Sequence, residues 1–175
     1  MNYATIKWTD IANGEGVRIS LFVSGCTRRC KNCFNAVAWD FNYGSPFTKE
    51  VQESILRGLE ADYIAGLSLL GGEPLEPGNQ RALLPFVREA KKRFPQKTVW
   101  CYTGNTFDPA TGLLKETEKN TEVTEELLSY IDVLVDGEFV EAEKNIRLKF
   151  RGSSNQRVLD VKKSKNLKIP VFYLD

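Results

Sequence analysis

Apolar residues along the chain occur in short runs, each followed by a loop and then by an amphipathic stretch. The runs favour strands and the stretches repeat with helical spacing, which is typical of βα units that build a parallel sheet. We expect strands at 18–23, 66–70, 98–103 and 131–136, and helices at 48–59, 80–94 and 124–130. The polar segment 105–120 has no clear period and is predicted to be a surface loop. The segment 169–174 is either an added strand or a docking tail.

The most distinctive residues follow the predicted strands. A cysteine-rich loop follows the first strand, Gly71–Pro74 the second, Thr103-Gly104 the third and Asp136-Gly137 the fourth. Ligands of parallel α/β proteins bind at the carboxyl ends of the strands, so these segments predict one shared site. The 175 residues are fewer than the roughly 250 of a complete eight-fold barrel. We therefore expect one domain, residues 1–175, of the α/β class, folded as an open partial barrel.

Three cysteines, Cys26, Cys30 and Cys33, stand close together in that first loop. Three thiolates can hold a four-iron cluster and leave its fourth iron open to a small molecule, whereas a zinc site or a closed cluster needs a fourth ligand. A fourth ligand cannot be histidine, because the sequence has none, so the obvious candidate is the one other cysteine, Cys101. Cys101 lies in a predicted strand between two aromatic residues, where we expect a buried apolar thiol. Zinc, a plain electron carrier and an open cluster remain the alternatives at this point.

Composition and charge narrow the class of protein. The chain carries 24 basic and 23 acidic residues, so no overall field favours nucleic acid or an anionic membrane. No apolar run approaches the roughly 18 residues of a membrane span, and residues 1–8 do not resemble a signal peptide. We expect a cytoplasmic protein, and in that reducing compartment neighbouring cysteines indicate a metal site. Without histidine, ordinary hydrolytic chemistry is not expected.

Further segments carry a family resemblance. Besides the cysteine triplet, Phe34-Asn35 and Gly71–Pro74, the matching segments are Asn13–Arg18, Leu21–Cys26, Val133–Gly137 and Phe150–Gln156. Together they resemble the radical S-adenosylmethionine (SAM) superfamily and, within it, the activating proteins of anaerobic ribonucleoside-triphosphate reductase. The resemblance extends over about residues 2–158.

The resemblance implies an oxidoreductase similar to the activating enzyme of formate C-acetyltransferase, with a radical SAM type of partial barrel. A [4Fe-4S] cluster on Cys26, Cys30 and Cys33 would bind the amino and carboxylate groups of SAM at its open iron. An electron, from reduced flavodoxin or a similar donor, would cleave SAM to methionine and a 5′-deoxyadenosyl radical. That radical would take a hydrogen atom from a glycine of the reductase.

The resemblance also suggests roles for single residues. Candidate cofactor-binding residues are Asn32, Cys33 and Phe34 beside the adenine, Gly71, Gly72, Glu73 and Pro74 at the amino-acid end, Asp136 at the ammonium or at a cation near the cofactor's carboxylate, and Arg151 at the cofactor or the incoming glycyl loop. The glycines lack Cβ atoms, which would let a ligand approach the backbone. Tight turns explain the glycines, Asp136 and the segment after Arg151 equally well. Arg28, Arg29 and Lys31 either favour the reduced cluster and guide an acidic donor, or only keep the loop soluble.

Three rival functions remain. The chain could activate a different glycyl-radical enzyme, or it could be a small radical enzyme that acts on a free metabolite. The rival from another class is a non-enzymatic iron-sulfur or zinc module, which predicts that Cys101 is a metal ligand.

Overall fold

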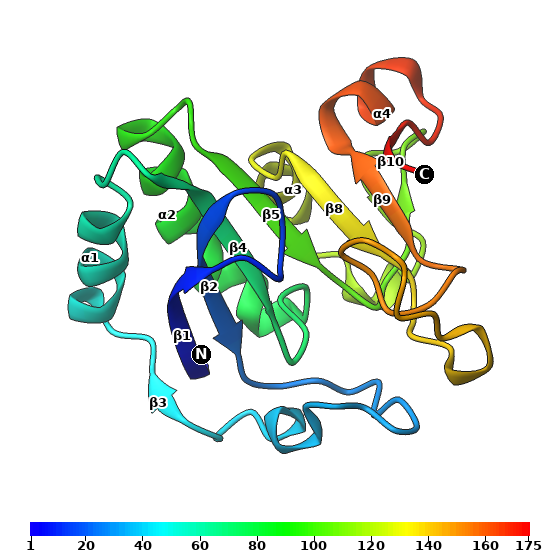
Figure 1. Ribbon diagram of the computed structural model, residues 1–175, viewed down its shortest axis with the longest axis horizontal. Coiled ribbons are helices and arrows are strands. Elements are labelled where there is room, and N and C mark those ends of the chain that lie inside the picture. The colour runs from blue at the N-terminus through cyan, green and yellow to red at the C-terminus, as the bar shows by residue number, and fades with distance from the viewer.

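One eight-stranded sheet forms the centre of the protein, and the computed structural model describes residues 1–175 (Figure 1). The strand order is β10-β9-β8-β5-β4-β2-β1-β3, with β2, β4, β5 and β8 parallel and the outer pairs antiparallel. The strands are β1 (Asn2–Asp10), β2 (Val17–Val23), β3 (Ser45–Pro46), β4 (Ile64–Gly71), β5 (Thr98–Tyr102), β8 (Val133–Asp136), β9 (Arg157–Asp160) and β10 (Phe172–Leu174). A separate two-stranded sheet joins β6 (Phe107–Asp108) to β7 (Leu113–Leu114).

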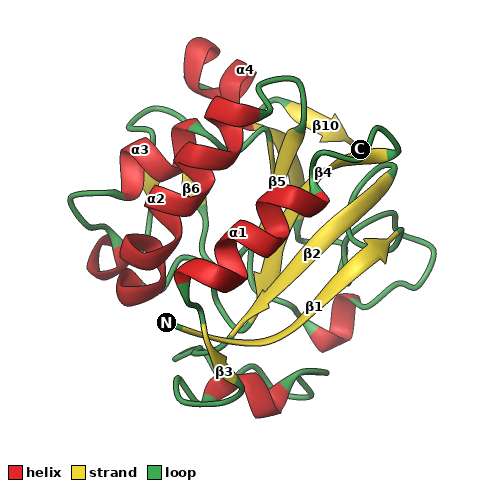
Figure 2. Ribbon diagram, turned by 90° about the vertical axis from the view of Figure 1, so that its left-hand side faces the viewer, coloured by secondary structure: helices red, strands yellow, loops and turns green.

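The helices gather on one side of the sheet (Figure 2). They are α1 (Lys49–Gly58), α2 (Pro77–Arg93), α3 (Thr124–Ser129) and α4 (Val161–Leu167), with short 3₁₀ turns η1 (Ala36–Trp39), η2 (Thr117–Lys119) and η3 (Glu141–Glu143). Thr48 caps α1 by accepting a hydrogen bond from the backbone N–H of Val51 at 3.3 Å. The helix α2 begins three residues before the predicted start because Pro77 is tolerated at its first position. The three predicted helices and four predicted strands are confirmed.

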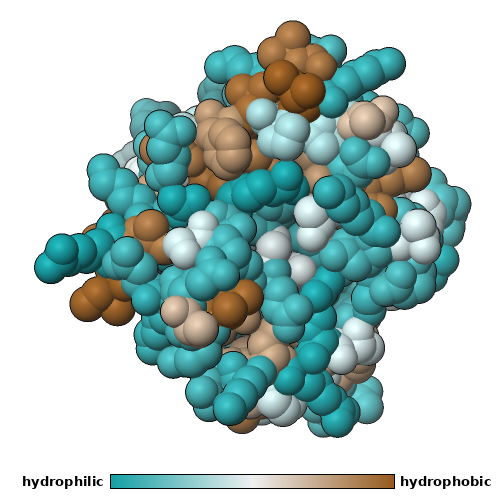
Figure 3. Space-filling view, turned by 90° about the vertical axis from the view of Figure 1, so that its right-hand side faces the viewer, coloured by the Kyte–Doolittle hydropathy of each residue, from teal (hydrophilic) through white to brown (hydrophobic).

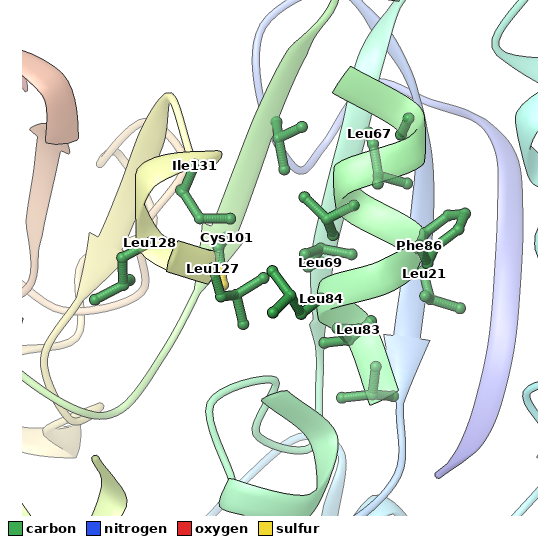
Figure 4. Close-up of a cluster of buried hydrophobic side chains, with 14 of the residues drawn as sticks. Leu21, Leu67, Leu69, Leu83, Leu84, Phe86, Cys101, Leu127, Leu128 and Ile131 are labelled. Carbon is green, nitrogen blue, oxygen red and sulfur yellow. The ribbon is translucent and has the colours of Figure 1, made fainter. Parts of the chain in front are cut away.

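The main core lies between the helices and one face of the sheet. In the register of the parallel strands, Leu21 pairs with Leu69, Leu69 with Cys101, and Cys101 with Leu134. Because side chains on neighbouring strands in register point to the same face, these residues form one continuous apolar row. Figure 4 shows Leu69 and Cys101 lying against Leu84 of α2 and Leu127 of α3. Each residue of the row is at most 1% exposed.

The segment 105–120 is the main correction to the sequence analysis. It is not a surface loop, because Phe107 and Leu114 pair as β6 and β7 and are buried in the main core. Asn105 at its start is also fully buried. Two-residue strands are too short to produce a recognisable hydrophobic period, so their burial depends on tertiary contacts that the local pattern does not contain.

The edge strands complete the sheet. Sequence patterns did not indicate β1 or β9, which add antiparallel strands beside β2 and β8. The C-terminal segment is an added strand, β10, in which Phe172 pairs with Leu159. The α/β class is thus confirmed as a mixed α/β fold with antiparallel edges, and the open barrel stays a prediction.

The surface of the C-terminal region is mostly hydrophilic, with apolar side chains gathered near the top of Figure 3. Exposed apolar residues of this region include Leu167, Ile169 and Phe172. None of the helices is both long and apolar enough to cross a membrane.

Candidate functional site

A cavity of about 410 Å³ lies where the four parallel strands end. Cys26 follows β2, Gly72 follows β4, Thr103 follows β5 and Gly137 follows β8, and all four line the cavity. The loop between β8 and β9 adds another wall, which includes Arg151. The four strand ends singled out in the sequence therefore surround one cavity.

The three loop cysteines share this cavity. Cys26, Cys30 and Cys33 all line it and are each partly exposed. Burial raises the pKa of the Cys26 thiol, and burial together with the nearby Glu138 carboxylate raises the pKa of Cys30 to about 11. No three Cys, Asp or Glu side chains are grouped closely enough to hold a single metal ion.

The cysteine loop leaves β2 under tight backbone restraint. The N–H of Gly25 donates to the carbonyl of Ala38 at 2.7 Å, and the N–H of Cys26 donates to the carbonyl of Trp39 at 3.2 Å. The segment that follows the three cysteines therefore folds back along the start of the loop.

Gly71 and Gly72 line the cavity, and their missing Cβ atoms also make room for the protein's own backbone. Gly71 has a φ of +112°, and a Cβ there would lie 2.6 Å from the backbone N and O of Val23. A Cβ on Gly72 would lie 2.6 Å from the carbonyl oxygen of Gly25. The space is thus filled by the protein's own backbone, so the glycines allow the end of β4 to pack against the start of the cysteine loop.

Glu73 joins the end of β4 to the end of β5. Its carboxylate accepts hydrogen bonds from the Thr103 hydroxyl at 2.7 Å, from the Gly104 N–H at 2.8 Å and from the Leu75 N–H at 2.9 Å. The residue is only 2% exposed, and burial raises the pKa of its carboxyl group. These bonds fix the carboxylate in the cavity wall and leave little freedom for its side chain.

Three predicted binding residues do not line the cavity. Asn32 is exposed and Pro74 is buried. Asp136 is fully buried, and its carboxylate accepts hydrogen bonds from Arg157 Nε at 2.8 Å and from the Phe107 N–H at 2.7 Å. The structure thus places the Asp136 carboxylate in an ion pair that joins β8 to β9 and β6.

Phe34 and Arg151 do line the cavity. Phe34 is 91% exposed, which leaves its ring free of packing against the rest of the chain. Arg151 Nη1 donates to the carbonyl of Gln156 at 2.8 Å, so part of the guanidinium already holds its own loop.

Sequence reasoning missed Tyr102, which also lines the cavity. Its hydroxyl is buried without a hydrogen-bond partner, and burial raises its pKa. Tyr102 could have been predicted as a lining residue, because it directly precedes Thr103-Gly104 at the carboxyl end of β5.

Cys101 lies away from the cysteine loop in the apolar row of the sheet. It is fully buried, it does not line the cavity, and burial raises the pKa of its thiol well above the ordinary value. The expectation of a buried apolar thiol is confirmed. Because the zinc interpretation used Cys101 as a fourth ligand, that interpretation loses its donor.

Comparison with known proteins agrees with this site. Residues 12–159 match a family model described as a 4Fe-4S single cluster domain. A protein of Pasteurella multocida is 44% identical over 158 residues, which cover 89% of this chain and 95% of the relative. It is named anaerobic ribonucleoside-triphosphate reductase-activating protein. Two relatives carry the same name. The one from Escherichia coli K12 is 40% identical over 90% of this chain and 97% of the relative, and the one from Enterobacteria phage T4 is 38% identical over 90% of this chain and 93% of the relative.

The chain belongs to the family of anaerobic ribonucleoside-triphosphate reductase-activating proteins. The family's 4Fe-4S domain supports an iron-sulfur cluster in this activating protein. The donors fit such a cluster, because three thiols from one short loop line one cavity and the chain offers no histidine. The resemblance inferred from the sequence motifs is confirmed at the level of this family.

Proposed function

We propose that this activating protein is a radical SAM enzyme, an oxidoreductase that cleaves SAM reductively and generates the glycyl radical on anaerobic ribonucleoside-triphosphate reductase. One observation carries the proposal: three thiols line a cavity at four strand ends, and the fourth cysteine is buried elsewhere. The names of the relatives support the reductase as the protein partner. We expect the reaction to take place in the cytoplasm.

In this proposal Cys26, Cys30 and Cys33 hold a [4Fe-4S] cluster. When bound, the cluster supplies an electron and an open iron for the amino and carboxylate groups of SAM. The protein itself positions the groups that would contact SAM. Gly71 and Gly72 present backbone groups at the cavity wall, and the buried Glu73 keeps that wall joined to β5.

Other lining residues serve the remaining parts of SAM. Phe34 offers an exposed apolar ring beside Cys33 for the adenine, and Arg151 keeps guanidinium donors available at the cavity wall. Asn32 and Pro74 then act through the backbone conformation of the segments that carry Cys33 and Glu73. Asn32 adopts a positive φ of 58°, which shapes the turn before Cys33.

The cavity is open, so a second protein is needed to exclude water from it. We propose that the reductase closes the cavity when its glycine enters. Arg29 and Lys31 are exposed and form no ion pair, which suits them to contact an acidic electron donor such as reduced flavodoxin.

The test is anaerobic reconstitution with iron and sulfide, followed by an assay for 5′-deoxyadenosine with SAM and a strong reductant. We expect the wild type to produce it. The Cys30→Ala variant should lose both iron and product, because a thiolate ligand is removed. The matched control Cys101→Ser should keep both.

Other outcomes separate the rivals. A loaded cluster that never cleaves SAM would indicate an electron-transfer module. Loss of iron in Cys101→Ser would contradict the proposed ligand set. Cleavage of SAM without a glycyl radical on the reductase would indicate a different target.

A further inference from the structure

The cysteine loop makes most of its polar contacts with the rest of the protein along its first half. Its anchored half runs from Gly25 to Arg28, where backbone and side-chain groups bond to distant segments. Its second half, 29–33, makes two polar contacts: the Cys33 N–H bonds to the carbonyl of Cys30 at 3.1 Å, and the Cys30 thiol approaches Glu138 at 3.5 Å. The loop thus combines a fixed segment with a free one.

Glu76 and Lys119 hold the anchored half at Thr27. The Thr27 N–H and hydroxyl both donate to Glu76 Oε1, at 2.9 and 2.7 Å. Lys119 Nζ donates to the Thr27 hydroxyl at 2.6 Å and to Glu76 Oε2 at 2.8 Å. The three side chains form a closed triangle of hydrogen bonds, which we call the Thr27 clamp.

The ion pair of the clamp is largely shielded from water, whereas Thr27 is exposed. The side chain of Glu76 is 3% exposed and that of Lys119 is 13% exposed. Gln80 of α2 fixes the backbone of Lys119, because its side-chain N–H donates to the Lys119 carbonyl at 2.7 Å. A buried ion pair of this kind contributes little net stability, whereas removal of one partner leaves an uncompensated charge. The Glu76–Lys119 pair is therefore better explained by its effect on the cysteine loop than by a contribution to overall stability.

The position of Glu76 strengthens this argument. Glu76 is the N-cap residue of α2, where a side chain ordinarily accepts a hydrogen bond from the helix backbone. Its carboxylate makes no such bond and is directed at Thr27 instead. Glutamate is not among the residues preferred at an N-cap, and here its side chain bonds to the cysteine loop.

Arg28 adds a second anchor beside the clamp. Its Nη2 donates to Asn105 Oδ1 at 2.7 Å, and it lies 3.5 Å from the Glu116 carboxylate. A Cβ on Gly104 would lie 2.5 Å from Arg28 Cδ, so that glycine leaves the room in which the arginine fits. Both anchors depend on the segment 105–120.

We propose that Glu76, Lys119 and Thr27 are positioning residues that fix Cys26 before the iron-sulfur cluster assembles, while Cys30 and Cys33 close around it afterwards. The inference rests on the cluster ligands of the proposed function. The second half, 29–33, favours this order of events. Arg29 and Asn32 have positive φ angles of 51° and 58° that few interactions enforce, so this half can change its backbone conformation when the cluster binds.

The test measures cysteine alkylation in the metal-free protein, under anaerobic conditions with limiting iodoacetamide and mass spectrometry at each cysteine. In Lys119→Met we expect the rate at Cys26 to rise about tenfold, the scale of one lost charge-assisted hydrogen bond. The rates at Cys30 and Cys33 should change less than about twofold, since they lie outside the clamp. Cys101, which is fully buried, reports global unfolding and should stay unreactive.

Two controls isolate the clamp. Arg81→Met removes an exposed ion pair between α2 and Glu122, away from the clamp, and should leave the Cys26 rate unchanged. Thr27→Val removes the hydroxyl and should behave like Lys119→Met, whereas Thr27→Ser keeps the hydroxyl and should restore the wild-type rate.

Iron retention provides a second measurement. After reconstitution, Lys119→Met should lose iron to a chelator about tenfold faster than Arg81→Met does. A Cys26 rate in Lys119→Met equal to that of the wild type would overturn the proposal, as would a parallel rise at Cys26 and Cys101. Neither result depends on SAM or the reductase, so failure here is distinguishable from failure of the proposed function.

Discussion

The two faces of the central sheet are built from alternate residues of the same strands, yet they differ sharply. On the helical face, Leu69 pairs with Cys101 in an apolar row without polar side chains. On the other face, Ser20 pairs with Ser68, and Ser68 with Trp100. Because the side-chain period of a strand is two, neighbouring residues in one strand separate an apolar core from a mixed layer, in which polar groups lie beside a smaller apolar cluster of Trp100, Val133, Val135 and Val158.

The cavity-side face tolerates groups that the core excludes. Arg18 is 1% exposed, donates to Ser68, to Thr98 and to backbone carbonyls, and has a pKa lowered to about 10 by burial. The Tyr102 hydroxyl on this side has no hydrogen-bond partner. Buried polar groups without partners cost stability, so the larger apolar core on the helical face carries more of the stability than the small apolar cluster on this face.

The largest expected effect comes from the apolar row. Leu69→Ala should lower the free energy of unfolding by about 2–5 kcal/mol, because it leaves a cavity between the sheet and α2. Denaturant titration measures this loss. Once the variant is folded and loaded, its rate of SAM cleavage per cluster should match that of the wild type. A specific loss of cleavage would show that the two faces are less independent than the structure indicates.

A smaller effect is expected at the strand end. Asp136→Asn weakens the bonds to Arg157 and to the Phe107 N–H, and should lower the free energy of unfolding by about 2 kcal/mol. The affinity for SAM, measured on the loaded protein, should stay unchanged because Asp136 does not line the cavity. A tenfold weaker affinity with unchanged stability would restore the direct binding role that the sequence suggested.

The smallest expected effect lies on the cavity face. Tyr102→Phe removes a buried hydroxyl that has no partner, so the free energy of unfolding should stay constant or rise by up to about 1 kcal/mol. Thermal unfolding of the metal-free protein measures it. A clear destabilisation would mean that the hydroxyl has a partner in solution. Weaker SAM binding without destabilisation would assign the hydroxyl to the ligand.

Local patterns predicted some regions much better than others. The parallel strands were predicted because each is a short run of mostly apolar residues, and α1 because Thr48 precedes a helical period. The segment 105–120 was mistaken for a loop because its buried positions are isolated from one another. The strand β1 was missed because all its residues except Asp10 are exposed or partly buried, which weakens the hydrophobic pattern.

By itself, the sequence determined the α/β class, the three neighbouring thiols, the strand ends that surround the cavity, and the family. These properties follow from residue types and from short spacings that survive without knowledge of the fold. The tertiary structure alone decided that Lys119 donates a hydrogen bond to Thr27, 92 residues away in the sequence, and that Arg157 forms an ion pair with Asp136. Strand order and register bring such residues together, and neither can be read from a local period.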